Sequence, residues 1–248
     1  MENNNPNYVY QNVMQMDDSE TASRKYLAKV FSWMFVALGI SAFCALEFYL
    51  NPSLMSLILN PAEGGGYSGF TGLGYFAIFA PVVFSLVAGF GYTKVSYPVM
   101  VFLFIAYAAT IGVSLSVLGL VYTSTSIFSM FLTSAILFGI MAVAGYTTQT
   151  DLTKMGSILF MIFIGAFVAG LVNFFIGSAQ LEYILSFVFV AVLIGLTAYY
   201  VQMLKRIGAG IEFGSDSSKK LVIIGAFVLY TTFINLFMSL LRIFGRRR

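Results

Sequence analysis

The sequence predicts an all-α polytopic membrane protein with seven transmembrane helices, and three observations support this fold class. First, 59% of the 248 residues are hydrophobic and only 9% are charged, with a mean hydropathy of +0.90. A globular domain carries about 25% charged residues, so most of this surface must face lipid. Second, seven apolar segments approach the roughly 20 residues that cross the hydrocarbon core. Third, the segments are too long and too weakly alternating for barrel strands, so the spans should be helical.

The chain begins with a polar, Asn-rich stretch at residues 1–25, which we interpret as a loosely ordered cytoplasmic tail. A seven-helix transmembrane domain is predicted at residues 26–245, followed by a basic C-terminal tail at 246–248. The stretch 51–74 carries two prolines and six glycines, which is typical of a loop rather than of a spanning helix. The predicted spans are 26–46, 75–92, 97–122, 127–146, 155–176, 183–204 and 221–241.

The orientation follows from the distribution of Lys and Arg, which are enriched in cytoplasmic loops. Nine basic residues fall on the side of the N-terminus, and four fall at the C-terminus on the other side. This asymmetry predicts a cytoplasmic N-terminus and an outside C-terminus. If the last segment returned instead of crossing, all 13 basic residues would be cytoplasmic, and this alternative stays open. The nine residues are Arg24, Lys25, Lys29, Lys94, Lys154, Lys205, Arg206, Lys219 and Lys220.

The composition excludes several classes of protein. Without histidine and with one cysteine, the chain has no HExxH metalloprotease motif, no Ser-His-Asp triad, no CxxC metal site and no disulfide framework. The small net charge of +3 gives no basic face for nucleic acid. No charged side chain lies well inside a predicted span, which argues against a proton pump or an intramembrane aspartyl protease. We therefore expect no enzymatic activity, no cofactor and no bound metal.

Small residues spaced four apart predict close helix contacts at Ala135 and Gly139, Gly165 and Ala169, and Ala166 and Gly170. Helix capping explains Asp151 in the turn before the fifth span, because a carboxylate there meets free N–H groups. A structural role is also expected for Asn173.

The last predicted span carries one polar stripe, because its polar residues recur at spacings of three and four. Lipid would leave the Asn235 amide without a partner, so the stripe should face the bundle interior. Two interpretations remain open, namely an interhelical hydrogen-bond seam or the lining of a water or ion path. The stripe comprises Thr231, Thr232, Asn235, Ser239 and Arg242.

Several stretches together resemble the bacterial branch of the Bax inhibitor-1 family of seven-span membrane proteins. The two most specific are LTAYYVQMLKRIG at 196–208 and LYTTFINLFMSLLRIFG at 229–245. AVAGYTTQTDLTKMGS at 142–157, VNFF at 172–175 and NPNYVY at 5–10 extend the resemblance over nearly the whole chain. It implies a bacterial inner-membrane protein in which six helices pack around a central seventh. Members are associated with pH-sensitive calcium leak, with suppression of cell death, and with restraint of a membrane-bound AAA protease.

In the calcium-leak members a pair of aspartates on the sixth and seventh helices is thought to sense protons. Such a pair shares a proton, because two close carboxylates cannot both ionise cheaply. Here Tyr200 and Thr232 occupy the two aspartate positions. In some members a basic residue pairs with the sixth-helix aspartate and acts as a latch. Lys94 roughly matches that basic residue, and with Tyr200 at the aspartate position the latch has lost its anion. We expect a pH-insensitive, mostly closed bundle in which the Tyr200 hydroxyl donates to the Thr232 oxygen.

Three functional hypotheses follow from the sequence and the resemblance. The first is a leak channel for Ca²⁺ or other cations, with Ca²⁺ as the transported ion. The alternative is a non-conducting regulator that binds a membrane protease or another membrane protein. The third is a relative that keeps the fold and has lost the family activity. Beyond the lipid bilayer, the sequence fixes neither the partner nor the oligomeric state.

Overall fold

A computed structural model describes residues 6–62, 66–79, 95–211 and 216–248, with side chains described from residue 19 onward. Six helices in this part of the chain are long and apolar enough to span a membrane. A helix at residues 72–79 includes the first five residues of the predicted second span, 75–79, and the remainder of that span lies outside the described residues. The six helices are α1 (Pro6–Leu50), α4 (Tyr97–Ser116), α6 (Ser124–Thr147), α7 (Thr153–Ile176), α8 (Ala179–Ala209) and α9 (Asp216–Phe244).

The helix ends follow from local chemistry. The Thr123 and Ser178 side chains accept hydrogen bonds from the backbone N–H groups of Ser126 and Leu181, which caps α6 and α8. Gly177 ends α7 in the left-handed region at φ 73°, where glycine has no Cβ penalty. Because such caps lie outside the apolar stretches, every observed span except α4 extends past its predicted start or end, by two residues in α7 and by four or more in the others.

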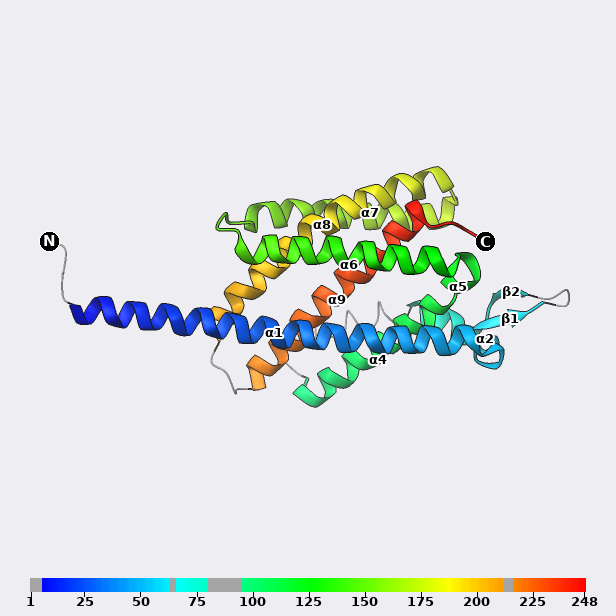
Figure 1. Cartoon of the computed structure of the whole chain (residues 1–248). Helices are drawn as coiled ribbons and strands as arrows, with labels where there is room; N and C mark the ends of the chain where they lie inside the picture. The colour runs from blue at the N-terminus through cyan, green and yellow to red at the C-terminus, as the bar shows by residue number, and fades with distance from the viewer. Residues whose placement is uncertain (1–5, 63–65, 80–94, 212–215) are drawn as a thin grey trace.

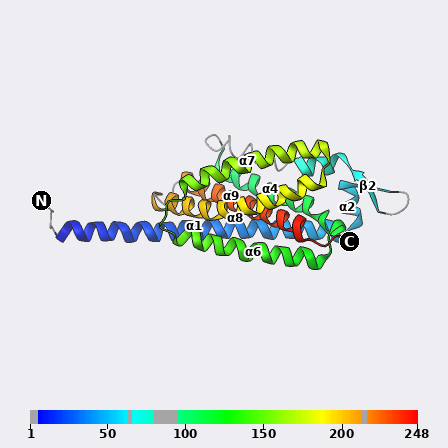
Figure 2. The same ribbon diagram turned by 90° about the horizontal axis from the view of Figure 1, so that it is seen from above.

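The N-terminal segment differs from the expected loosely ordered tail, because α1 is helical from Pro6. The helix projects beyond the other helices before it enters the bundle (Figures 1 and 2). Among the side chains described from residue 19 onward, the first that are almost fully buried are Ser23 and Tyr26. The Ser23 hydroxyl donates to the Lys205 carbonyl of α8 at 3.0 Å. No proline or glycine interrupts residues 7–25, so the helical hydrogen bonding continues outward from this packed region.

The predicted loop at 51–74 contains regular structure that the sequence did not reveal. It holds the short helix α2 (Pro52–Ile58) and the antiparallel strands β1 (Leu59–Pro61) and β2 (Tyr67–Phe70). Gly66 has a φ of 86°, which explains a glycine at the turn. The two strands add a small sheet to a molecule that is otherwise helical, and none of these elements is long enough to span a membrane.

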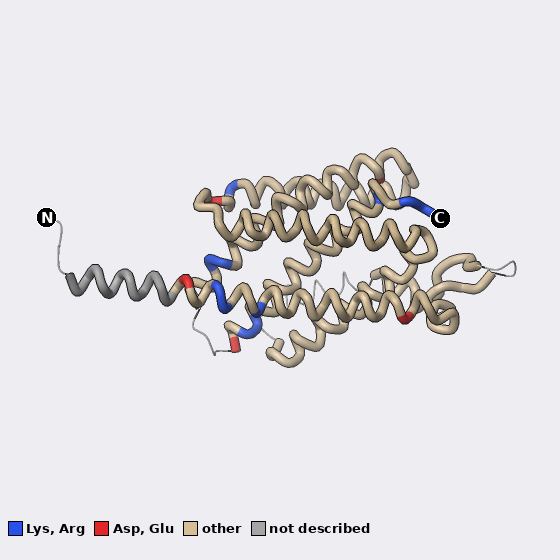
Figure 3. Tube along the Cα trace, viewed as in Figure 1, with Lys and Arg blue, Asp and Glu red and all other residues tan. Residues whose placement is uncertain are grey.

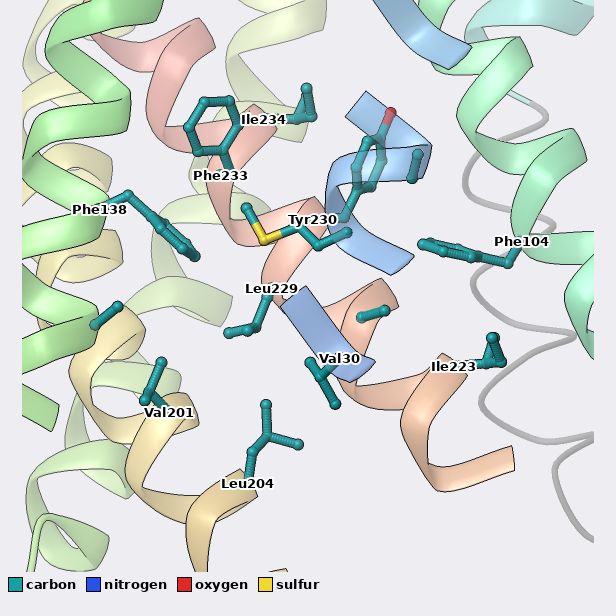
Figure 4. Close-up of a cluster of buried hydrophobic side chains, with 14 of the residues drawn as sticks. Val30, Phe104, Phe138, Val201, Leu204, Ile223, Leu229, Tyr230, Phe233 and Ile234 are labelled. Atoms are coloured by element: carbon teal, nitrogen blue, oxygen red, sulfur yellow. The ribbon is translucent and has the colours of Figure 1, made fainter. Parts of the chain in front are cut away.

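Helix α9 is the central helix among those described. It packs against α1, α4, α6 and α8, whereas α7 packs chiefly against α8. In its most apolar stretch 61% of the residues are buried, compared with 39% in α8 and 11% in α7. Figure 4 shows Val30, Phe104, Phe138 and Val201 around the α9 side chains. The expected arrangement around a central helix is therefore present for four neighbours, while α7 lies outside this ring (Figure 2).

The basic residues divide between the two ends of the bundle (Figure 3). We call the end that carries Lys205 and Arg206 the basic end, and the opposite end, where the chain finishes, the C-terminal end. Helix α9 runs without interruption from Asp216 at the basic end to Phe244 at the C-terminal end. The last segment therefore traverses the bundle instead of returning, and Arg246–Arg248 lie opposite the other basic clusters.

The close helix contacts lie at other glycines than predicted. A Cβ built on Gly139, Gly165 or Gly170 would meet nothing within 4 Å. A Cβ on Gly145 of α6 would instead overlap the Ala198 backbone of α8, at 2.7 Å from its Cα. Spacing in the sequence identified small residues, but it did not identify the side of the helix that faces a neighbour.

Large apolar side chains cover much of the outer surface. Phe102, Phe128 and Phe174 are each more than 65% exposed. A soluble monomer rarely exposes so much contiguous apolar surface, whereas lipid accommodates it. This surface supports the prediction of a multi-pass membrane protein.

Candidate functional site

Four hydroxyl groups meet at the centre of the bundle, and we call them the central hydroxyl seam: Ser41 of α1, Tyr107 of α4, and Tyr230 and Thr231 of α9. The Tyr230 and Ser41 hydroxyl oxygens are 2.6 Å apart, and those of Tyr107 and Thr231 are 3.1 Å apart. Ser41 and Tyr230 are almost fully buried. The seam therefore ties the central helix to α1 and α4.

The hydrogen bonds around Ser41 form one directed chain. The Ser41 oxygen lies 2.7 Å from the Ala108 carbonyl and 2.9 Å from the Ala37 carbonyl. Because a carbonyl oxygen can only accept, these short contacts require the single Ser41 hydroxyl proton to point toward the carbonyls. The Tyr230 hydroxyl must then be the donor to Ser41. Every hydroxyl group in this arrangement is neutral and has a hydrogen-bond partner. The seam therefore joins the helices by hydrogen bonds without any charged group.

The predicted polar stripe of α9 is only partly an interhelical seam. Thr231 bonds to Tyr107, but the Ser239 hydroxyl donates to the Asn235 carbonyl of its own helix at 2.8 Å. The Asn235 side chain is partly exposed and makes no hydrogen bond to another described residue. Arg242 lies at the C-terminal end, 3.8 Å from Glu182. Residues four apart share a helix face, yet they reach different depths and different neighbours.

Tyr200 and Thr232, which the resemblance predicts to occupy the family's aspartate positions, lie on α8 and α9. The Thr232 hydroxyl is buried and donates to the Val228 carbonyl in the same helix at 2.8 Å. Tyr200 is half-buried, and its ring centroid is 5.4 Å from that of Tyr199. Among the described residues no hydrogen bond joins Tyr200 to Thr232, so the expected bond between them is not found. Lys94, the expected latch residue, lies outside the described residues.

Sequence reasoning missed Ser41, Tyr107 and Tyr230. A signal was available for the two tyrosines, because both fall in the middle of apolar segments. Other tyrosines, such as Tyr97 and Tyr146, lie near the ends of the predicted spans, where an aromatic ring sits at the membrane interface. A buried hydroxyl at membrane depth must find a partner, so a mid-span tyrosine indicates an interhelical hydrogen bond.

A second polar cluster at the basic end fastens the α6–α7 connection to α8. The Gln202 amide donates to the Thr150 carbonyl at 2.8 Å and accepts from the Leu152 N–H at 2.9 Å. The Lys205 ammonium donates to the Tyr146 carbonyl at 2.9 Å and lies 4.5 Å from the centre of that ring. Lys205, interpreted from the sequence only as an orientation signal, therefore also holds the end of α6 against α8.

Asp151 completes this cluster. Its carboxylate accepts from the Thr153 N–H at 2.9 Å, which confirms its expected role at the start of α7, and it lies 2.9 Å from the Arg206 guanidinium. The Thr153 hydrogen bonds and then Arg206 lower the pKa of Asp151 from 3.8 to about 2. Because the pKa of Asp151 is lower in the folded protein, its carboxylate stabilises the fold at pH values above the usual pKa of 3.8. This contribution to stability is lost as the pH falls toward 2. The Asp151 carboxylate therefore stays charged near neutral pH.

Comparison with known proteins identifies the family. A model of the family described as inhibitor of apoptosis-promoting Bax1 matches residues 23–248. The inner membrane protein YbhL of Escherichia coli is 40% identical over 224 residues, which cover 90% of this chain and 92% of that protein. The chain belongs to the Bax inhibitor-1 family. The uncharacterized protein RP147 of Rickettsia prowazekii is 36% identical over 225 residues, covering 91% of each chain.

Membership in the Bax inhibitor-1 family confirms the resemblance seen in the sequence. The family model extends from Ser23, where α1 first packs on the bundle, to the last residue. YbhL is an inner membrane protein by name, and the six apolar helices of this family member agree with a multi-pass membrane protein. In the described part of the chain no three Asp, Glu or Cys side chains are grouped so that they could hold a metal ion.

Proposed function

We propose that this Bax inhibitor-1 family member is a cation leak protein of the inner membrane, with Ca²⁺ as the transported ion, and that it is mostly closed and insensitive to pH between about 6 and 8. Its N-terminus is proposed to be cytoplasmic, since nine of the thirteen basic residues fall on that side. The single observation that carries the proposal is the pair Tyr200 and Thr232 at the family's aspartate positions.

The proposed closed state follows from the chemistry of those two positions. A carboxylate pair changes its charge when it binds or releases the shared proton, and this change can separate two helices. A tyrosine ordinarily titrates near pH 10 and a threonine does not titrate, so neither changes charge near neutral pH. The central hydroxyl seam is also uncharged, and its hydrogen bonds between helices persist across this range. Both features favour one arrangement of α9 against its neighbours.

The test is calcium flux into proteoliposomes at pH 6 and pH 8. The parent chain is expected to show the same low flux at both values. The double variant Tyr200→Asp and Thr232→Asp should restore a titratable pair, so that flux differs by about tenfold between the two values, as expected when one proton controls opening. The pKa of Asp151 is about 2, so this carboxyl group does not titrate in this range.

A matched control replaces the same residues with Tyr200→Asn and Thr232→Asn, which are close in size to aspartate and do not titrate. This variant should stay insensitive to pH. A strong pH dependence in the parent chain contradicts the closed, insensitive state. If neither the parent nor the aspartate variant conducts, the leak function is wrong for this protein.

A second candidate function is favoured by the projecting helix α1. We propose, as the alternative, a non-conducting regulator that binds a membrane protease or another membrane protein through the helix that extends from Pro6 beyond the bundle (Figure 1). This segment is polar and leaves the packed bundle before any other helix begins, so a partner can reach it without displacing α8 or α9. No titratable group inside the membrane is needed for this function.

Deleting residues 1–18 separates the two functions, because it removes the projecting part and keeps the bond from Ser23 to the Lys205 carbonyl. If the regulator function holds, crosslinking to a membrane AAA protease should fall about tenfold, the loss of roughly 1.4 kcal/mol of binding free energy. Circular dichroism should report an intact bundle. Unchanged crosslinking counts against a binding role for this segment, and calcium flux should be unaffected by the deletion in either case.

A further inference from the structure

An apolar groove opens on the side of the bundle near its C-terminal end. It has a volume of about 380 Å³ and lies among α1, the short helix α5 (Leu118–Val121), α6 and α9. This volume falls within the roughly 300–1,000 Å³ of small-molecule pockets. Leu46 of α1 and Phe128 of α6 line the groove and are 58% and 68% exposed, so its opening faces the surrounding lipid. Ile234 and Phe237 of the central helix form part of its wall.

Tyr49 connects this groove with the basic C-terminal tail. Its side chain lines the groove, and a Cβ on Gly119 of α5 would lie only 2.5 Å from its ring, so glycine permits this close approach. The Arg248 guanidinium donates to the Tyr49 hydroxyl at 3.0 Å. The cationic tail is therefore in direct contact with a residue of the groove wall.

The backbone of the tail is held in this position. The Arg246 carbonyl accepts from the Thr123 N–H at 3.1 Å, and the Arg248 N–H donates to the Val121 carbonyl at 2.9 Å. The Arg246 N–H also donates to the Ser126 hydroxyl at 3.0 Å. These bonds fix the three arginines next to the start of α6, which itself borders the groove.

The charges of the tail are not neutralised within the described part of the protein. Arg246, Arg247 and Arg248 are exposed, and none of the ion pairs among the described residues includes them. Glu182 lies 3.8 Å from Arg242, and the Glu47 carboxylate accepts from the Asn51 amide at 3.0 Å, so neither carboxylate forms an ion pair with the tail. Three free cations at the membrane interface attract anionic headgroups.

We propose that this groove binds an acyl chain of one anionic phospholipid, whose phosphate lies against Arg246–Arg248. The apolar wall and the exposed, lipid-facing opening match an acyl chain, and the three arginines match the phosphate. Inorganic phosphate would use only the charges, and a neutral lipid would gain less from them. An anionic phospholipid satisfies both parts of the site at once. Ser41 of the central hydroxyl seam also lines the groove, but the proposed lipid binding does not depend on the proposed leak activity.

The test is native mass spectrometry of the full chain in detergent, titrated with phosphatidylglycerol or with phosphatidylcholine of the same acyl chains. One phosphatidylglycerol is expected to bind in preference to phosphatidylcholine. Replacing the arginines by Arg246→Gln, Arg247→Gln and Arg248→Gln should weaken phosphatidylglycerol binding about fivefold for each charge removed. Filling the groove with Ala45→Trp should reduce binding of both lipids.

Matched controls separate this site from general lipid attraction. The triple variant Lys25→Gln, Lys219→Gln and Lys220→Gln removes three charges at the basic end, and Ala144→Trp adds an indole at an exposed position of α6 outside the groove. Both should bind phosphatidylglycerol like the parent chain. The proposal is wrong if the two lipids bind equally well, or if these controls weaken binding as much as the arginine and groove variants. Binding of inorganic phosphate in competition with the lipid would show that only the arginines are used.

Discussion

Replacing Tyr230 with alanine is expected to lower the free energy of unfolding by about 3–5 kcal/mol, the range for removing a fully buried aromatic side chain. Tyr230 is 0% exposed, and its ring packs edge-on against Phe104 and Tyr107 at centroid distances of 6.0 and 5.8 Å. Within a bilayer this packing replaces the hydrophobic effect as the main source of helix association. Unfolding by sodium dodecyl sulfate, followed by circular dichroism, measures the change.

The variant Tyr230→Phe separates packing from hydrogen bonding, because it keeps the ring and removes the hydroxyl that donates to Ser41. It should cost only about 0.6 kcal/mol, the average for a hydrogen bond between membrane helices. Ser41 keeps its bond to a backbone carbonyl in this variant. If Tyr230→Phe destabilises the protein as much as Tyr230→Ala, the hydroxyl seam rather than the aromatic packing holds α9 in place.

Replacing Gly145 with valine is expected to destabilise the protein by about 3 kcal/mol, at the upper end for overpacked interiors. The added Cβ would overlap the carbonyl oxygen and the Cα of Ala198, so α6 and α8 would have to move apart. Backbone atoms cannot rotate away as a flexible side chain can. Displacement of α6 would also strain the connection that Gln202 and Lys205 hold at the basic end. Thermal unfolding in detergent measures the effect.

The matched control is Gly139→Val, six residues earlier in the same helix. A Cβ on Gly139 meets nothing within 4 Å, so valine there should change stability by less than about 0.5 kcal/mol, as at an ordinary surface position. Both substitutions introduce the same β-branched residue into one helix, so their difference isolates the contact with Ala198. Equal effects at the two positions would contradict the close α6–α8 approach.

Six of the seven predicted spans overlap described helices that are long and apolar enough to cross a membrane, because the thickness of the bilayer sets the length of such a segment. Helix α7 was expected at 155–176 and is observed at Thr153–Ile176. Asp151 was expected to serve the start of that helix, and its carboxylate accepts the Thr153 N–H. The fold class and the family were equally accessible, since both rest on local composition and on linear motifs. The expected loosely ordered tail was wrong, since polarity alone does not prevent α1 from continuing outward to Pro6.

By itself, then, the sequence determined that this chain is a helical membrane protein of the Bax inhibitor-1 family. Only the tertiary structure decided which polar groups meet, namely Tyr230 with Ser41 across 189 residues and Thr231 with Tyr107 across 124. It also decided that Gly145, and not Gly139, contacts another helix. The physical reason is that spacing along one helix fixes which residues share a face. The neighbour that this face meets depends on how all the helices pack and rotate together.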